Sequence, residues 1–350
     1  MKHQKDATSN VKIVDEMSHV HELPKEHLAE HFQDHIGAMV LGKAGDNDIF
    51  VCSTIYHVGG RLWGIKDGAL VQTNLIIAPS DQRKMQNNDF VGNRLDPMKS
   101  FSNFQIVQES DKGVWIAGNR RMVCCPPYWE MKGEHMGVDL DLTMGGIGES
   151  IPYHGPWSDL SAKGVAGNEH LGWAEGSLTF KGKKYIFDEG WAVRERTCFG
   201  KGFDVPSLLG HSTGYIWGWC FSESIKIFCF AEPEANHFSG RVFLEDQIIN
   251  FGVGDITVEP LEFWKDTLTD VTIPIQWNII MKAAGGTVEM NVAIWARALF
   301  GFHLTEGYTT HHAGLGRANG RFVFPDGHSV SIKECQAYFE QGKATPLGIG

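Results

Sequence analysis

The stretch that decides the fold is GSLTFKGKKYIFDEGWAVRE, residues Gly176 to Glu195, because its layout occurs twice more in the chain. The other two copies read GRVFLEDQIINFGVGDITVE, Gly240 to Glu259, and GRFVFPDGHSVSIKECQAYFE, Gly320 to Glu340. Each copy opens on glycine, runs through alternating apolar residues across a turn with glycine or aspartate, and closes on glutamate. Glycine and aspartate suit the tight turns that join antiparallel strands. The repetition predicts a chain of antiparallel hairpins with a duplicated β module.

The composition limits the classes of function. The 350 residues include 42 acidic and 31 basic side chains, and the net charge of −11 argues against nucleic acid and anionic membranes as partners. The polar start of the chain lacks a secretory signal, and no apolar run is long enough to span a membrane. Seven cysteines without a CxxC pair do not indicate a disulfide framework. We therefore expect a cytoplasmic protein with reduced thiols, for which an oligomer is possible.

The chain divides into a short polar segment and two β-rich halves. Residues 1–36 are polar and rich in histidine, with a short helix expected over Leu23 to Phe32. From residue 37 onwards, strand-like apolar segments alternate with glycine, asparagine and aspartate, which is typical of hairpins. We expect an all-β protein with consecutive antiparallel domains at 37–204 and 205–350. Because so many strands must hide their edges, each domain should close into a barrel or a sandwich.

One segment resembles a known family. Residues Gly172 to Gly200, GWAEGSLTFKGKKYIFDEGWAVRERTCFG, are similar to the junction motif of a lipocalin-like superfamily. Its members include AttH-type proteins, carotenoid 1,2-hydratases, kievitone hydratase and fungal Diels-Alderases. The family motif has a glycine and then Arg-Asp-His before an aromatic residue and a second glycine. The corresponding residues here are Gly190, Arg194, Glu195, Arg196, Phe199 and Gly200.

This chain departs from the family motif at two positions. Arg196 stands where the family has histidine, and Glu195 replaces the aspartate, which moves the carboxyl group by one methylene. A proton donor that relied on the family imidazole is therefore missing. The resemblance implies two lipocalin-like β domains with an apolar ligand cavity within or between them. It also implies cofactor-independent hydration, dehydration, isomerisation or cyclisation of a hydrophobic small molecule.

Strand alternation places Glu195 on the same face as Trp191 and Val193, and Arg194 on the opposite face with Arg196. If the Trp191 face lines a cavity, desolvation should raise the pKa of Glu195 and make it a general acid. The alternative is a structural ion pair between Glu195 and an arginine of a neighbouring strand. The repetition of this glutamate as Glu259 and Glu340 favours that alternative.

Other polar residues near the junction motif are further candidates for the site. Arg194 and Arg196 suit the binding of a substrate carboxylate or carbonyl, or they pair with Asp188 or Glu189 across the hairpin. His170 and His154 are candidates for acid–base catalysis near the mouth of a cavity, or they are histidines of exposed loops. Large aromatic residues in apolar strands either fill a core or line a substrate pocket. The pocket candidates are Trp173, Trp191, Tyr215, Trp217, Trp219 and Trp295.

Two further patterns indicate other functions. His27, His31 and His35 have the four-residue spacing of one helical face, but their terminal position argues against a functional metal site. The sequence from Gly210 to Gly214 matches GxSxG, which leaves a serine esterase that uses Ser212 as an alternative. A strand-like segment follows this match where a nucleophile elbow requires a helix. We expect neither a metal nor another cofactor, and a non-catalytic carrier of hydrophobic ligands is the main alternative to an enzyme.

Overall fold

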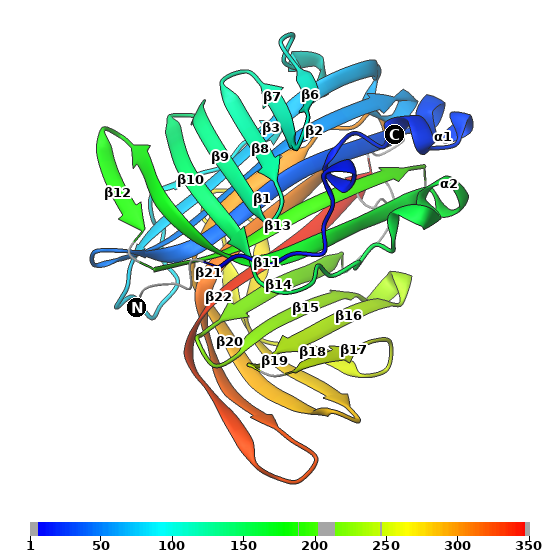
Figure 1. Cartoon of the computed structure of the whole chain (residues 1–350). Coiled ribbons are helices and arrows are strands. Elements are labelled where there is room, and N and C mark those ends of the chain that lie inside the picture. The colour runs from blue at the N-terminus through cyan, green and yellow to red at the C-terminus, as the bar shows by residue number, and fades with distance from the viewer. Residues whose placement is uncertain (1–5, 188, 202–213, 246, 347–350) are drawn as a thin grey trace.

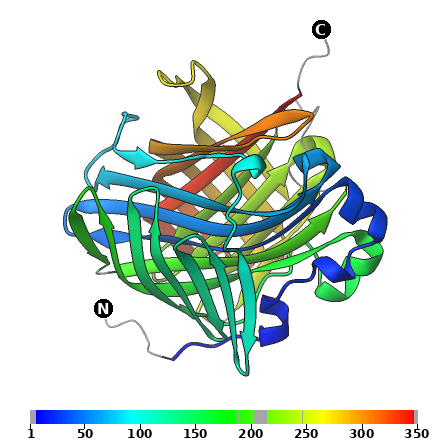
Figure 2. The ribbon, with the colours of Figure 1, turned by 90° about the horizontal axis from the view of Figure 1, so that it is seen from above.

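The computed structural model describes residues 6–187, 189–201, 214–245 and 247–346 of the chain. Its strands form two curled antiparallel sheets that lie beside each other, the first blue to green and the second yellow-green to red (Figures 1 and 2). The prediction of an all-β protein with two lipocalin-like sheets is confirmed. Among the described residues, no helix is both long enough and apolar enough to cross a membrane.

The first sheet contains twelve strands. In spatial order they are β4 (Phe90–Val91), β3 (Ile65–Pro79), β2 (Asn47–Gly60), β1 (Phe32–Ala44), β13 (Glu189–Gly200), β11 (Val165–Phe180), β10 (Val138–Gly146), β9 (Tyr128–His135), β8 (Arg120–Cys125), β7 (Lys112–Ala117) and β6 (Gln105–Glu109), with β12 (Lys183–Phe187) paired to β11. The short helices of the same half are η1 (Ile13–Glu16), η2 (Val20–Glu22), α1 (Lys25–Glu30), η3 (Arg61–Trp63), η4 (Pro97–Lys99), η5 (Trp157–Asp159) and α2 (Leu160–Lys163).

The second sheet contains ten strands. Their order is β17 (Ile248–Phe251), β16 (His237–Phe243), β15 (Lys226–Glu232), β14 (Tyr215–Phe221), β22 (Ser329–Pro346), β21 (Gly307–Val323), β20 (Gly286–Phe302), β19 (Thr272–Ala283) and β18 (Ile256–Lys265), with β5 (Arg94–Leu95) beside β20. The helix η6 (Pro233–Ala235) follows β15. Because β5 comes from the first half of the chain, this short strand ties the two sheets together. The predicted division at residue 204 falls among residues outside the described ranges and stays a prediction.

The three repeated stretches form hairpins, as predicted. β11 pairs antiparallel with β12, β16 with β17, and β21 with β22. The turn glycines Gly182 and Gly327 have φ values of +74° and +91°, which residues with a Cβ rarely adopt. The glutamates at the ends of the stretches have different positions, since Glu195 and Glu340 lie in central strands whereas Glu259 is exposed on the edge strand β18.

The two sheets repeat one arrangement of strands. In the first sheet, the long final strand β13 lies between the opening strand β1 and β11. In the second sheet, β22 likewise lies between the opening strand β14 and β21. Glu195 and Glu340 therefore occupy equivalent places, on the last strand of each sheet.

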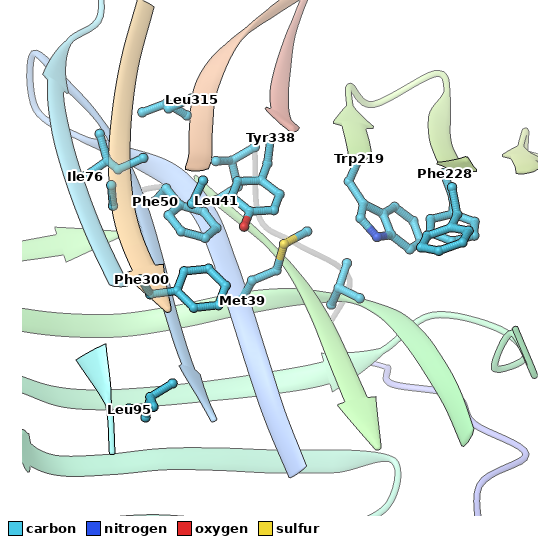
Figure 3. Packing of buried hydrophobic residues seen from close by; sticks show 14 of the residues in the cluster. Met39, Leu41, Phe50, Ile76, Leu95, Trp219, Phe228, Phe300, Leu315 and Tyr338 are labelled. Atoms are coloured by element: carbon cyan, nitrogen blue, oxygen red, sulfur yellow. The ribbon is translucent and has the colours of Figure 1, made fainter. Parts of the chain in front are cut away.

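Buried residues form a core within each half and a third core between the halves. Apolar side chains of both sheets contribute to the shared core, including Phe50, Trp219, Trp295 and Tyr338. Figure 3 shows Phe50 of β2 beside Tyr338 of β22, and their stacked rings have centroids 4.1 Å apart. Because each strand alternates its side chains, one face of each sheet covers its own core and the other faces this interface.

The N-terminal segment packs against the first sheet. The expected short helix is present as α1, and Glu16 of η1 is fully buried. Glu16 accepts a hydrogen bond from Arg194 and one of 3.2 Å from Trp129 Nε1. Because α1 ends at Glu30, His35 lies on strand β1 and shares no helical face with His27.

Candidate active site

A small cavity of about 100 Å³ lies between the two sheets. Both sheets and the loop before α2 contribute to its wall, which combines aromatic rings with ionisable groups. The ionisable and phenolic residues that line it are Glu195, Glu232, Glu340, His35, His154, His237, His311, Cys52, Tyr56, Tyr153 and Tyr215. Trp217, Phe199, Phe230, Phe300 and Phe302 supply the other rings. Such a lining offers both proton transfer and contact with an apolar ligand.

Glu195 is the centre of a cluster on the first sheet. Its Oε2 lies 3.2 Å from His35 Nε2, and its Oε1 accepts a hydrogen bond of 3.0 Å from the Tyr153 hydroxyl. The amide Nε2 of Gln33 lies 3.3 Å from His35 Nδ1. If the Gln33 amide donates to Nδ1, Nε2 is the ring nitrogen that donates a hydrogen bond to Glu195. About a quarter of the Glu195 side chain, 26%, remains accessible.

These contacts reverse the pKa shift expected from burial. Desolvation alone would raise the pKa of Glu195, but the His35 imidazole and the Tyr153 hydroxyl outweigh it, so the pKa is lowered. Glu195 is therefore ionised at neutral pH and is suited to accept a proton, whereas the general-acid interpretation requires a raised pKa. The alternative is an ion pair between Glu195 and an arginine on a neighbouring strand. The contacts of the Glu195 carboxyl group are instead with His35 and Tyr153.

Glu340 is the centre of a matching cluster on the second sheet. Its carboxylate accepts hydrogen bonds from the Tyr215 hydroxyl and, over 2.6 Å, from the Tyr338 hydroxyl. His311 Nδ1 lies 2.9 Å from the Tyr215 oxygen and 3.3 Å from Glu340 Oε1. The Thr309 hydroxyl lies 3.0 Å from the other ring nitrogen of His311. The cavity thus contains two clusters of carboxylate, imidazole and phenol, one from each sheet.

Glu169 is a functional candidate that the sequence analysis missed. It lies directly opposite Glu195 in the pairing of β11 with β13, and its side chain is fully buried. Trp217 Nε1 donates a hydrogen bond of 2.6 Å to Oε1, and Oε2 has no hydrogen-bond partner among the described residues. Burial, together with the charge of Glu195, raises the pKa of Glu169 well above its usual range. Two neighbouring carboxyl groups thus have pKa values shifted in opposite directions, as in many acid–base sites.

Arg194 and His170 lie on the opposite face of the first sheet, away from the cavity. Arg194 donates a 2.7 Å hydrogen bond to Asn168 Oδ1, pairs with Glu16, and stacks over the Trp129 ring. His170 Nδ1 lies 2.8 Å from the carbonyl oxygen of Leu171. Burial, followed by the charge of Arg194, lowers the pKa of His170 to about 4. The structure does not bring either residue together with Glu195.

Arg196 is also buried on this opposite face of the sheet. Its guanidinium pairs with Asp34 and donates to the carbonyl oxygen of Met17. The cross-hairpin partners that the sequence suggested, Asp188 and Glu189, have side chains outside the described part of the structure. Both arginines bind acidic residues from the start of the chain.

The six aromatic candidates divide between the cavity and the cores. Tyr215 and Trp217 line the cavity, and their role in substrate binding stays a prediction. The other four, Trp173, Trp191, Trp219 and Trp295, do not line it. Trp191 faces the interface, where it stacks on Phe221 with ring centroids 6.0 Å apart, and Trp219 packs against Phe228 in the shared core. The guanidinium carbon of Arg83 lies over the Trp295 ring, 5.0 Å from the ring centroid.

His154 lines the cavity beside the Glu195 cluster. Its ring packs against Tyr153, with ring centroids 3.6 Å apart. Burial holds the pKa of His154 well below its usual range, and His237 and His35 lower it further. The imidazole is therefore neutral at neutral pH. Ser212, the nucleophile of the esterase alternative, lies outside the described residues.

We found no group of three histidine, cysteine, aspartate or glutamate side chains able to hold a metal ion within the described residues. No protein-family model and no curated protein matches the sequence. Solved structures do match the fold. A protein from Nitrosomonas europaea assigned as AttH aligns over 96% of this chain and 97% of its own, with a TM-score of 0.56 and 9% identity. The Diels-Alderase CghA, crystallised with Sch210972, aligns over 92% and 89% with a TM-score of 0.52 and 10% identity.

The chain therefore has the two-sheet, lipocalin-like fold of the AttH and Diels-Alderase structures. The resemblance inferred from the junction motif is confirmed at the level of the fold. Identities of 9% and 10% extend this likeness to the arrangement of strands and no further.

Proposed function

We propose that this protein is a cofactor-independent lyase or isomerase, of the hydratase, dehydratase or cyclase type. Its site is the cavity between the two sheets, and its substrate is a largely hydrophobic small molecule. The observation that carries this proposal is the contact of the Glu195 carboxyl group with His35 and Tyr153 at the wall of an aromatic cavity, which lowers the pKa of Glu195. A carrier of apolar ligands needs no such group, whereas general acid–base catalysis does.

Glu195 acts as the general base. Its carboxylate faces the cavity, and the bond from Tyr153 fixes the direction of one oxygen. Glu195 takes a proton from a carbon atom of the substrate or from water. His35 and Tyr153 remain in contact with its carboxyl group and stabilise the change of charge on that group. Glu169 does not line the cavity and acts through Glu195. Because its raised pKa keeps its carboxyl group neutral, it places no second negative charge beside the base.

The opposite cluster binds the polar end of the substrate. Tyr215 lines the cavity and is held by both Glu340 and His311, so its hydroxyl is oriented before a ligand arrives. Trp217 and Phe230 supply flat apolar surface beside it. A cavity of about 100 Å³ is smaller than the roughly 300–1,000 Å³ of pockets that enclose drug-sized ligands. The substrate is therefore compact, or it places its reacting end alone between the sheets.

Product analysis tests this proposal. The purified protein is incubated with terpenoid alkenes, aryl enones and linear polyenes, and mass spectrometry follows the gain of water, the loss of water or an isomer. We expect conversion of at least one compound by the wild type and by Glu259→Gln, whose side chain is exposed. Glu195→Gln should still bind that compound without converting it. Binding without conversion by the wild type would instead support the carrier, and labelling of Ser212 by a fluorophosphonate would support the esterase.

A further inference from the structure

The wall of the cavity between the sheets is rich in carboxyl groups. Three glutamates line it, Glu195 from the first sheet and Glu232 and Glu340 from the second. Of the residues that the structure describes, no lysine or arginine lines this cavity. Each of the three carboxyl side chains keeps accessible surface, 26% for Glu195, 12% for Glu340 and 10% for Glu232. The protein therefore offers carboxyl groups to a ligand here, without a guanidinium or ammonium group to balance them.

The imidazoles of the wall do not balance these carboxyl groups either. Burial lowers the pKa of His154 and of His237, so both of these rings are neutral at neutral pH. Of the four histidines that line the cavity, at most His35 and His311 can carry positive charge, against three carboxyl groups. An anionic ligand would lose its hydration at this wall without meeting an excess of positive charge.

Two groups at the site show the effect of this negative charge. Burial raises the pKa of the Cys52 thiol, which lines the cavity, and the charges of Glu340 and Glu195 raise it further. Burial likewise raises the pKa of Tyr338, and the charge of Glu340 adds to the shift. A thiol and a phenol become negative when they lose a proton. Charges that oppose this ionisation favour a positive charge in the same place.

Aromatic rings lie around Glu340 on the second sheet. Trp217 lies directly opposite Glu340 in the pairing of β14 with β22, and the Tyr215 hydroxyl donates a hydrogen bond to the Glu340 carboxylate. Phe230 stacks on Tyr215, with ring centroids 5.8 Å apart. All three rings line the cavity, and those of Tyr215 and Trp217 are partly exposed. The faces of such rings attract cations, as carboxylates do.

We propose that the ligand of this cavity is an organic cation, a substituted ammonium ion whose charged group lies against Glu340 and the rings of Tyr215 and Trp217. The inference rests on the proposed function for the reaction and names its substrate class, an amine with an apolar remainder. Glu195 stays available as the base, because Glu340 and Glu232 come from the other sheet. The rings that attract the charge also pack against the carbon atoms of the amine.

Choline and 3,3-dimethylbutan-1-ol test this proposal. The two probes have the same shape, but a neutral carbon in the alcohol replaces the charged nitrogen of choline, and both are compact enough for a cavity of about 100 Å³. Isothermal titration calorimetry in about 150 mM sodium chloride measures both affinities, since salt screens the general attraction of a cation to a chain of net charge −11. We expect the wild type to bind choline at least about tenfold more tightly than the alcohol. Equal affinities would overturn the proposal.

Glutamine variants locate the cation. Glu340→Gln keeps the shape of the side chain and removes its charge, so the preference for choline should fall at least about threefold while the affinity for the alcohol stays the same. Glu232→Gln, a second variant of the same kind, should lower the preference as well. Glu259→Gln is the matched control, because that side chain is exposed on the edge strand β18 and should leave the preference intact. Circular dichroism and the melting temperature show that each variant is folded.

The results separate this proposal from the proposed reaction. A full preference for choline in both Glu340→Gln and Glu232→Gln would place the cation elsewhere on the chain and overturn the proposal. Conversion of a neutral compound by a wild type without a preference for choline would support the reaction and contradict the cation. A preference that depends on Glu340, without conversion of any compound, would support the cation site and contradict the reaction.

Discussion

Trp217 Nε1 donates a hydrogen bond of 2.6 Å to Glu169 Oε1 and so joins strand β14 of the second sheet to strand β11 of the first. Trp217 lies directly opposite Glu340 in its own sheet, and Glu169 lies directly opposite Glu195. One hydrogen bond thus connects the strand partners of the two equivalent glutamates. The geometry of the cavity depends on how the sheets meet at this contact.

Trp217→Phe tests the strength of this contact. The change removes the donor and leaves the buried Glu169 carboxyl group without this hydrogen bond, so the free energy of unfolding should fall by about 1–3 kcal/mol. The packing lost because phenylalanine has a smaller ring than tryptophan adds to this loss. Urea denaturation measures the difference. Trp277→Phe is the matched control, because its Nε1 has no acceptor among the described residues and its loss costs no hydrogen bond. If both variants lose the same stability, the Trp217–Glu169 bond contributes nothing.

Glu169 should make the stability of the fold depend on pH. Its pKa is raised in the folded state by burial and by Glu195, so the protonated form is favoured there. Below the unfolded-state pKa of about 4.5 both states hold the proton, and the full stability is present. As the pH rises towards the folded-state pKa, unfolding releases the proton and stability is lost.

Glu169→Gln removes this titration but keeps an oxygen for Trp217. We expect the variant to gain stability relative to the wild type as the pH rises from 4.5 to 8, and the gap to be smallest at the acidic end. Urea denaturation at each pH measures this gap. A gap that stays constant with pH would show that Glu169 is ionised in the folded protein.

The hairpins were predictable because they depend on local chemistry. Glycine at the turns and alternating apolar residues specify a β-hairpin without reference to distant parts of the chain. The same alternation correctly separated Glu195 from Arg194, which lie on opposite faces of β13.

The partners of these residues were not predictable in this way, because they depend on strand order and register. Glu195 meets His35 only because the opening strand β1 pairs with the closing strand β13, and Tyr153 comes from a loop. Glu169 gave no local signal, since its importance comes from its position opposite Glu195. The direction of the Glu195 pKa shift was missed for the same reason, because burial was visible in the pattern whereas the two hydrogen-bonding neighbours were not.

Glu16→Ala tests the structural role of Arg194. Both side chains of this ion pair are buried, with exposures of 2% for Arg194 and 0% for Glu16. Removing one partner leaves a buried charge, so the free energy of unfolding should fall by about 3–5 kcal/mol. The control is Glu289→Ala, which breaks the exposed pair with Arg321 and should cost less than about 1 kcal/mol. Similar losses for both variants would mean that the Arg194 pair is not structural.

The proposed reaction should depend on pH through Glu195. Burial raises the pKa of Glu195, but His35 and Tyr153 lower it by more, so the base stays ionised to a pH below the ordinary range of a glutamate side chain. The rate that depends on Glu195 should be constant from neutral pH down to about 4.5, the ordinary pKa of a glutamate, and should fall only at lower pH, as protonation removes the base. Tyr153→Phe removes one lowering contact and should move this acid limb to higher pH. Circular dichroism at each pH separates loss of rate from unfolding.

Glu195→Gln should lower the rate by about 10²–10⁴-fold, the usual contribution of a positioned base, while the variant remains folded. Glu259→Gln, which changes the glutamate that ends the second repeated stretch and lies exposed on the edge strand β18, should keep the wild-type rate. Glu340→Gln should mainly weaken substrate binding and raise KM, because Glu340 orients the Tyr215 hydroxyl. Equal losses of stability at Glu195 and Glu340, with unchanged rates per folded molecule, would assign both glutamates to the architecture of the repeat. An acid limb centred between pH 6 and 7 in the wild type would instead point to an imidazole of the cavity as the base.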